Sequence, residues 1–143
     1  MKRTPLVRHK PLRAKKRVAR PSLTSLKRKA DRLWSQLILS KGQCEVCGRK
    51  ATNPHHFISR TNRTLRHDPR NGVALCYRCH IGGNPSAHGD PIFITTWMMC
   101  KRPDDYNYLF EKREELATQV DYTQVITSLE RKLKEKEDGN HNQ

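Results

Sequence analysis

The stretch that decides the fold of this chain is residues 44–80, CEVCGRKATNPHHFISRTNRTLRHDPRNGVALCYRCH. Two Cys-x-x-Cys pairs, Cys44/Cys47 and Cys76/Cys79, open and close it, with 28 residues between the pairs. Each pair brings two sulfurs together in one tight turn, and four thiolates are the ligand set of a structural zinc. Four unrelated thiols are the alternative, but two such pairs in a chain of five cysteines favour a closed Zn²⁺ site. The metal would replace a core that this polar segment cannot build.

Three histidines of the same stretch lie outside the four-cysteine set. Neighbours on a strand point to opposite faces, so one of His55 and His56 could bind a metal while the other faces a substrate. His80 follows the last cysteine directly, and the turn would hold it rigidly. Asn71 precedes the second expected strand, where its amide would fix the loop that joins the two strands. The isolated histidines are predicted to be ordinary surface or core residues: His9, His67 and His141.

The chain is strongly basic, with 29 Lys+Arg against 14 Asp+Glu, a net charge of +15 and a pI near 10.1. Such a chain usually binds a polyanion, most often nucleic acid. Its sequence has no basic amphipathic helix with an aromatic face, no apolar run of roughly 18 residues, and no apolar run in its basic N-terminus. We therefore expect DNA as the partner, no membrane contact, and a cytoplasmic, reducing location in which paired cysteines bind metal. Four arginines lie within or beside the expected strands, where they would contact phosphates or form a solvated basic face: Arg60, Arg63, Arg66 and Arg70.

Helical periodicity and turn residues predict an α+β fold. We expect a first helix over residues 25–40, capped by Thr24 or Ser25, and short strands at residues 56–59 and 72–75. After Cys79 a turn or short helix must be interrupted by Gly82, Gly83 and Pro85.

The C-terminal part has a helical pattern. Phe93 and Trp97 are spaced to share one helix face. Asp104 or Asp105 would cap a helix over residues 106–119 that turns Leu109 and Leu116 inward. A last helix over residues 123–136 has an apolar face that could form a homodimer, made by Val125, Ile126, Leu129 and Leu133.

His56, Asn71 and His80 resemble the H, N and H of the HNH nucleases, at intervals of fifteen and nine residues and within two Cys-x-x-Cys knuckles. The resemblance covers about residues 44–88. It implies a small ββα-metal, treble-clef-like finger stapled by the four-cysteine zinc and flanked by helices. It also implies DNA phosphodiester hydrolysis with His56 as general base, Asn71 orienting the loop and base, and His55 and His80 as ligands of a catalytic cation. Mg²⁺ or Mn²⁺ would suit that cation, and imidazole ligands also permit Ni²⁺ or Zn²⁺.

The stretch after His80, IGGNPSAH, departs from the simplest family pattern because glycines and a proline stand where a helix is expected. On an unbroken helix His88 would lie about 80° round from His80. The interruption could bring His88 closer as a third ligand, with a surface histidine as the equal alternative and Asn84 as a weaker candidate.

A looser resemblance reaches outward to phage recombination nucleases of the lambda Rap (NinG) type, on ADRLWSQLILSKGQCEVCG and FITTWMM…DYNYLFEKREELA. It implies branched DNA as the substrate and a bacterial host cell as the location. Together these features predict four regions: a disordered basic arm (1–23), a zinc-bound nuclease domain with its leading helix (24–100), a helical extension (101–137) and a frayed tail (138–143). The competing functions are a non-catalytic zinc module that binds nucleic acid, which leaves the histidines unexplained, and a zinc-dependent protein adaptor, which leaves the basic arm unexplained.

Overall fold

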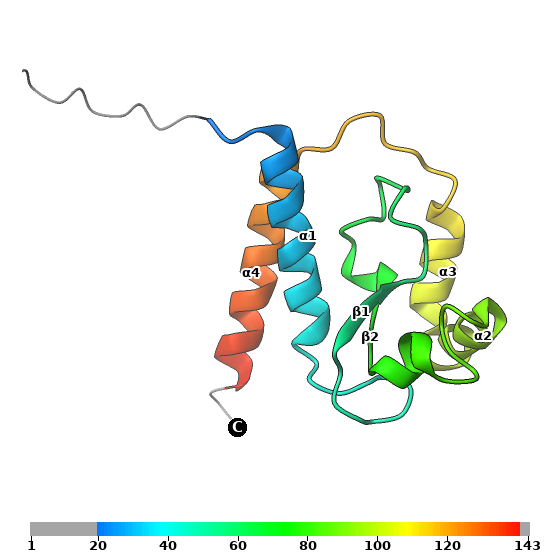
Figure 1. The fold of residues 1–143 in the computed structure, drawn as a ribbon. Helices are drawn as coiled ribbons and strands as arrows, with labels where there is room; N and C mark the ends of the chain where they lie inside the picture. The colour runs from blue at the N-terminus through cyan, green and yellow to red at the C-terminus, as the bar shows by residue number, and fades with distance from the viewer. Residues whose placement is uncertain (1–19, 141–143) are drawn as a thin grey trace, which may run out of the picture.

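A two-stranded antiparallel sheet lies between two groups of helices in the computed structural model, which describes residues 20–140 (Figure 1). Most of the predicted arm and the last three residues of the predicted tail lie outside this range. The α+β fold is confirmed. The elements in chain order are α1 (Leu23–Leu39), β1 (Asn53–His56), η1 (Pro69–Asn71), β2 (Gly72–Leu75), η2 (Arg78–Gly82), α2 (Pro91–Lys101), α3 (Pro103–Lys112) and α4 (Tyr122–Asn140).

Helix α1 begins earlier than the sequence predicted. The Ser22 hydroxyl accepts a hydrogen bond from the Ser25 backbone N–H at 3.2 Å, so Ser22 is the cap and neither Thr24 nor Ser25 has that role. The helix ends where Gly42 adopts a φ of +74° and its N–H donates to the Leu39 carbonyl at 2.9 Å.

The two strands hold the central histidines. Strand β2 lies where it was predicted, but β1 spans Asn53–His56 and not residues 56–59. Beyond Phe57, the chain leaves the ladder because the Ile58 N–H donates to the Asn71 side chain at 2.6 Å. In the register His56 pairs with Gly72 and His55 with Val73, which places both histidines at the end of β1.

Helices α1 and α4 run side by side along one flank of the sheet (Figure 1). Leu129 of α4 is buried against Trp34, Leu37 and Ile38 of α1, together with Ala74 of β2. The apolar face that suggested a homodimer is therefore covered within the chain, which removes the reason for that expectation. Helix α4 also continues to Asn140, so the first residues of the predicted frayed tail are helical.

Helices α2 and α3 pack together at the other flank of the sheet (Figure 1). Helix α3 ends at Lys112, well before the predicted residue 119. Leu109 is buried as predicted, but Leu116 is 72% exposed. The reason is that the chain after α3 bonds to the loop after β1: the Asn62 amide donates to the Arg113 carbonyl at 2.9 Å, and the Ala117 N–H donates to the Thr64 hydroxyl at 2.9 Å. Over residues 20–140, no helix combines the length and apolarity needed to cross a membrane.

Candidate active site

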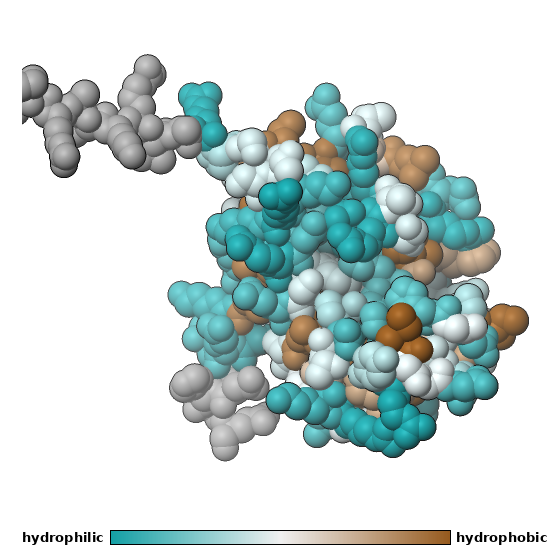
Figure 2. Space-filling model, viewed as in Figure 1, coloured by the Kyte–Doolittle hydropathy of each residue, from teal (hydrophilic) through white to brown (hydrophobic). Residues whose placement is uncertain are grey.

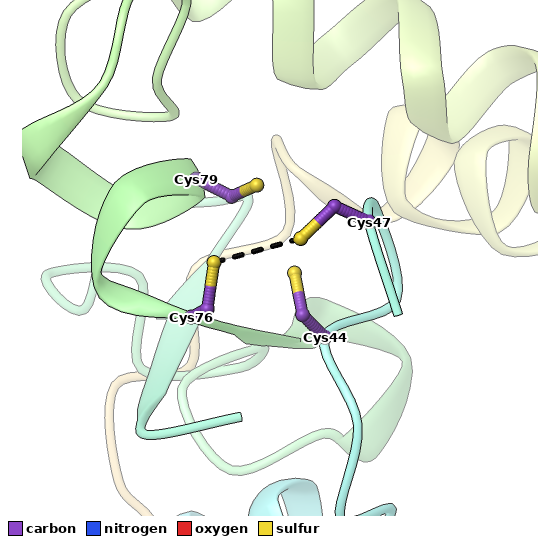
Figure 3. Close-up of side chains that lie close together, drawn as sticks. All are labelled: Cys44, Cys47, Cys76 and Cys79. Atoms are coloured by element: carbon purple, nitrogen blue, oxygen red, sulfur yellow. Dashed lines mark hydrogen bonds between the residues drawn. The ribbon is translucent and has the colours of Figure 1, made fainter. Parts of the chain in front are cut away.

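The four paired cysteines converge as the sequence predicted (Figure 3). Their sulfurs all lie within 4.8 Å of one another, and those of Cys47 and Cys76 are 3.6 Å apart. Tetrahedral Zn–S bonds of about 2.3 Å would place sulfurs about 3.8 Å apart, so the set fits a zinc ion. A hydrogen bond from the Cys79 backbone N–H lowers the pKa of the Cys76 thiol to about 7, against the effect of burial. Cys44 and Cys76 belong to the hydrophobic core and Cys47 is exposed, and a set of four cysteines is the ligand set of a structural zinc.

Three histidines form a second cluster with the spacing of metal ligands. A ring nitrogen from each of His55, His80 and His88 lies within 4.8 Å of the others, and the Nε2 atoms of His80 and His88 are 3.1 Å apart. Two tetrahedral ligands with metal–nitrogen bonds of about 2.0–2.1 Å would be about 3.3 Å apart. Burial, followed by the neighbouring histidines, lowers the pKa of His55 to about 4, so its imidazole is neutral and able to bind a cation.

The interruption after His80 brings His88 to this cluster. Residues Arg78–Gly82 form a single π-helical turn in place of a regular helix, and the chain then folds back. The Ala87 N–H donates to the Cys79 carbonyl at 2.8 Å, and the His88 N–H donates to the His80 carbonyl at 3.1 Å. These two backbone bonds set the rings of His80 and His88 face to edge, with centroids 4.7 Å apart.

His56 is held in one orientation by a ring and a carbonyl. Its imidazole stacks on Trp34 of α1 with centroids 3.7 Å apart. Its Nε2 lies 2.9 Å from the backbone carbonyl of Arg66, which can only accept, so Nε2 carries the proton and Nδ1 keeps its lone pair. Burial lowers the pKa of His56 to about 4, although the bond to the carbonyl acts to raise it. The ring is therefore neutral at neutral pH and can accept a proton at Nδ1.

Asn71 is fully buried and ties down the loop that follows β1. Its Nδ2 donates to the carbonyls of Ile58 and Leu65, both at 3.0 Å, and its Oδ1 accepts from the Ile58 N–H. Both polar atoms of this side chain are thus bonded to the loop between the two strands.

One cavity of about 450 Å³ joins these groups. Its lining includes His55, His56, His80 and His88, and α1 contributes Asp31 and Trp34. The predicted base and the predicted ligands therefore share one cavity, whose lining does not include the cysteine cluster.

The four predicted phosphate-binding arginines have different surroundings. Arg60 is exposed and lines the histidine cavity. Arg63 donates to the Thr118 carbonyl at 3.1 Å, and Arg70 pairs with Asp68 and lies over the Tyr108 ring. Arg66 is only 9% exposed, because its guanidinium is bound within the fold. For Arg66 the prediction of a phosphate contact is wrong.

A partly buried ionic cluster centred on Asp31 was not predicted from the sequence. The Arg66 Nε and Nη2 atoms donate to the two carboxylate oxygens of Asp31, both at 2.8 Å, and His67 Nε2 donates to Oδ1 at 2.8 Å. Partial burial acts to raise the pKa of Asp31, but the hydrogen bonds from Arg66 and His67 outweigh it and lower the pKa to about 2. His67, predicted to be ordinary, is buried here. The one signal in the sequence was that Asp31 is the single acid among the first 44 residues.

Comparison with known families gives one result for this region. Residues 44–83 match the family described as HNH endonuclease. The match covers both cysteine pairs, His55, His56 and His80, and stops before His88; it also leaves out α1. Neither the curated proteins nor the solved structures give a match to the chain. The family match supports a nuclease-type or nucleic-acid-binding function and indicates DNA as substrate or partner.

Proposed function

We propose that this chain, whose residues 44–83 match the HNH endonuclease family, is a metal-dependent DNA endonuclease. The observation that carries the proposal is the shared cavity, in which three histidines at metal-ligand spacing lie beside a fourth histidine, His56, whose Nδ1 keeps its lone pair. A zinc module that only bound nucleic acid would need the four cysteines but not this second cluster.

His56 is the proposed general base. Its Nε2–H is occupied by the Arg66 carbonyl, so Nδ1 is the atom that takes the proton from the attacking water. Stacking on Trp34 restricts rotation of the ring, which keeps Nδ1 in one place during the reaction. Asn71 holds the loop that contains the Arg66 carbonyl through its bond to the Leu65 carbonyl.

His55, His80 and His88 are the proposed holders of the catalytic cation. A divalent cation there would stabilise the negative charge that develops on the phosphate and the leaving oxygen. Mg²⁺ or Mn²⁺ is our first choice, and the all-imidazole donor set also suits Ni²⁺ or Zn²⁺. The four cysteines, in contrast, would hold a structural Zn²⁺ whose coordination leaves no position for substrate.

The surface beside the cavity is suited to a DNA backbone. A second hollow of about 460 Å³ is lined by Ser25, Arg28 and Arg32 of α1 and shares Asp31 with the histidine cavity. Among the residues that the structure describes, neither Arg28 nor Arg32 makes an ion pair with an acid. Hydrophilic side chains cover much of the upper part of the molecule in the view of Figure 2. With Arg60 at the cavity itself, these arginines would position phosphates on either side of the scissile bond.

The test is DNA cleavage by purified protein with Mg²⁺ or Mn²⁺, beside a His56→Ala variant. Supercoiled plasmid reports cutting of ordinary duplex. A synthetic four-way junction, compared with a linear duplex of the same length, tests the proposal that branched DNA is preferred. We expect metal-dependent cleavage in the wild type and its loss, by about 10²–10⁴-fold, in the variant. Zinc content and helicity should be unchanged. Equal activity in the two proteins would reject His56 as base, and binding of both DNAs without any cleavage would favour the non-catalytic zinc module.

A further inference from the structure

Helix α1 lies outside the region that matches the nuclease family, yet it is connected to the proposed base directly through Trp34 and indirectly through Asp31. Trp34 stacks on the His56 ring, with an angle of 11° between the planes. The Trp34 Nε1–H also donates to the Asp68 carbonyl at 3.0 Å, which holds the same indole against the segment that joins β1 to β2. The second connection is indirect: it begins at Asp31, which lies one turn before Trp34 on the helix.

Asp31 reaches His56 through one intermediate residue. Both carboxylate oxygens of Asp31 accept from the Arg66 guanidinium at 2.8 Å, and the backbone carbonyl of Arg66 accepts from His56 Nε2 at 2.9 Å. The third arm of the guanidinium, Nη1, donates to the Arg60 carbonyl at 2.8 Å. Arg66 is therefore held at three points, and its carbonyl is fixed against His56.

We propose that Asp31 is a positioning residue for His56: it anchors Arg66 so that the Arg66 carbonyl holds the imidazole in the Nε2–H tautomer. Bidentate carboxylate–guanidinium pairs have a defined geometry that a single charge–charge contact lacks. His67 completes the anchor, because its Nε2–H donates to Oδ1 at 2.8 Å and its ring lies against Tyr122 of α4. The proposal rests on His56 being the base, and it assigns part of the active site to a helix that the family match does not include.

The test compares Asp31→Asn with Glu130→Gln in the full chain. The amide introduced by Asp31→Asn has the shape of the carboxylate but would place an N–H group against the Arg66 donors. Glu130 is a matched control because it pairs with Lys29 of the same helix as Asp31 at 2.7 Å and, within residues 20–140, makes no ion pair with the loop that holds Arg66. Asp31→Glu keeps the carboxylate and serves as the conservative variant.

Two readouts separate positioning from a general loss of structure. The first is the split between kcat and KM for DNA cleavage: Asp31→Asn should lower kcat by about 10²-fold and leave KM unchanged. The second is the ¹⁵N signature of the His56 ring, which should change from a single Nε2–H tautomer in the wild type to a mixture in Asp31→Asn. Glu130→Gln should match the wild type in both, and Asp31→Glu should recover most of the lost kcat. Helicity and zinc content establish that each variant is folded.

Each outcome decides one of the two proposals. Unchanged kcat and unchanged His56 signals in Asp31→Asn would overturn the positioning role. A wild-type protein that cleaves no DNA would overturn the nuclease function alone, since the ring signature still tests whether Asp31 fixes the tautomer. If Asp31→Asn does not fold, Arg66→Lys replaces it: the lysine keeps a positive charge beside Asp31 but loses the bidentate pair, so the same shift in the His56 signature is expected.

Discussion

The Nε2 atoms of His80 and His88 lie 3.1 Å apart, although the residues are eight positions apart in the chain. A shared proton or a shared cation must lie between two imidazole nitrogens at this distance, because two lone pairs would repel. His55 provides a third nitrogen within 4.8 Å, which favours the cation. The pair therefore marks the place where the proposed catalytic cation would bind.

Replacing His88 by alanine should weaken binding of Mn²⁺ at this site. Loss of an outer-shell partner of a ligand already costs roughly 10–100-fold in metal affinity, so removal of a ligand should cost at least that. Isothermal titration with Mn²⁺ on zinc-loaded protein measures the change. His88→Asp, which supplies a carboxylate oxygen, is the matched control and should retain part of the affinity. Unchanged Mn²⁺ affinity in His88→Ala would remove this residue from the site.

The four-cysteine cluster should hold one structural zinc per chain. Cys79→Ser removes a ligand and should abolish zinc retention, together with the cooperative thermal transition, because metal binding of this kind supplies folding free energy of about 10 kcal/mol. Cys100→Ser is the control: Cys100 is exposed and outside the cluster, so zinc content and melting temperature should equal those of the wild type. Elemental analysis and circular dichroism provide both measurements. Retention of zinc by Cys79→Ser would contradict the assignment.

Gly72 should not tolerate a methyl group. A Cβ at this position would lie 2.6 Å from Ile38 Cγ1 and 2.7 Å from Trp34 Cζ2, at the point where β2 packs on α1. Gly72→Ala should therefore destabilise the fold by about 1–3 kcal/mol. It should also displace the Trp34 ring on which His56 stacks, and so lower cleavage.

Gly139→Ala should have the opposite effect on stability from Gly72→Ala. A Cβ there meets nothing within 4 Å, and the residue lies in helix α4. Alanine should stabilise the helix by up to about 1 kcal/mol. Urea unfolding of both variants gives the two differences. A Gly72→Ala protein as stable as the wild type would show that Ile38 and Trp34 move aside freely.

The arginines of α1 should contribute to the salt dependence of DNA binding. Each neutralised phosphate contributes about −0.9 to the slope of log affinity against log salt concentration. The double variant Arg28→Gln/Arg32→Gln should therefore reduce the magnitude of the slope by up to about 1.8. The control Lys50→Gln/Lys101→Gln removes the same charge from exposed positions outside the two hollows, and it should change the slope less. Equal slopes for both double variants would mean that DNA does not lie along α1.

Much of the centre of this protein could be predicted from local patterns. Cys-x-x-Cys pairs act through turns of a few residues, so their spacing alone indicates that the sulfurs converge. Strand β2 could also be predicted from its short apolar run between turn residues, and the apolar face of α4 from its helical periodicity. Periodicity does not say which element covers an apolar face. The face of α4 that contains Leu129 therefore suggested a homodimer, whereas in the structure α1 of the same chain covers it.

The sequence by itself determined the metal-binding residue types, the strand that leads to the second knuckle, and the basic charge that indicates a nucleic-acid partner. Tertiary structure alone decided that His88 joins His80, because backbone hydrogen bonds across a glycine- and proline-interrupted turn set that contact. It also decided that the Arg66 guanidinium is buried in a pair with Asp31 and is not exposed on the basic surface. The physical reason is that the burial of the Arg66 guanidinium depends on its ion pair with Asp31, 35 residues away. An ion pair between such distant positions produces no periodic pattern in the sequence.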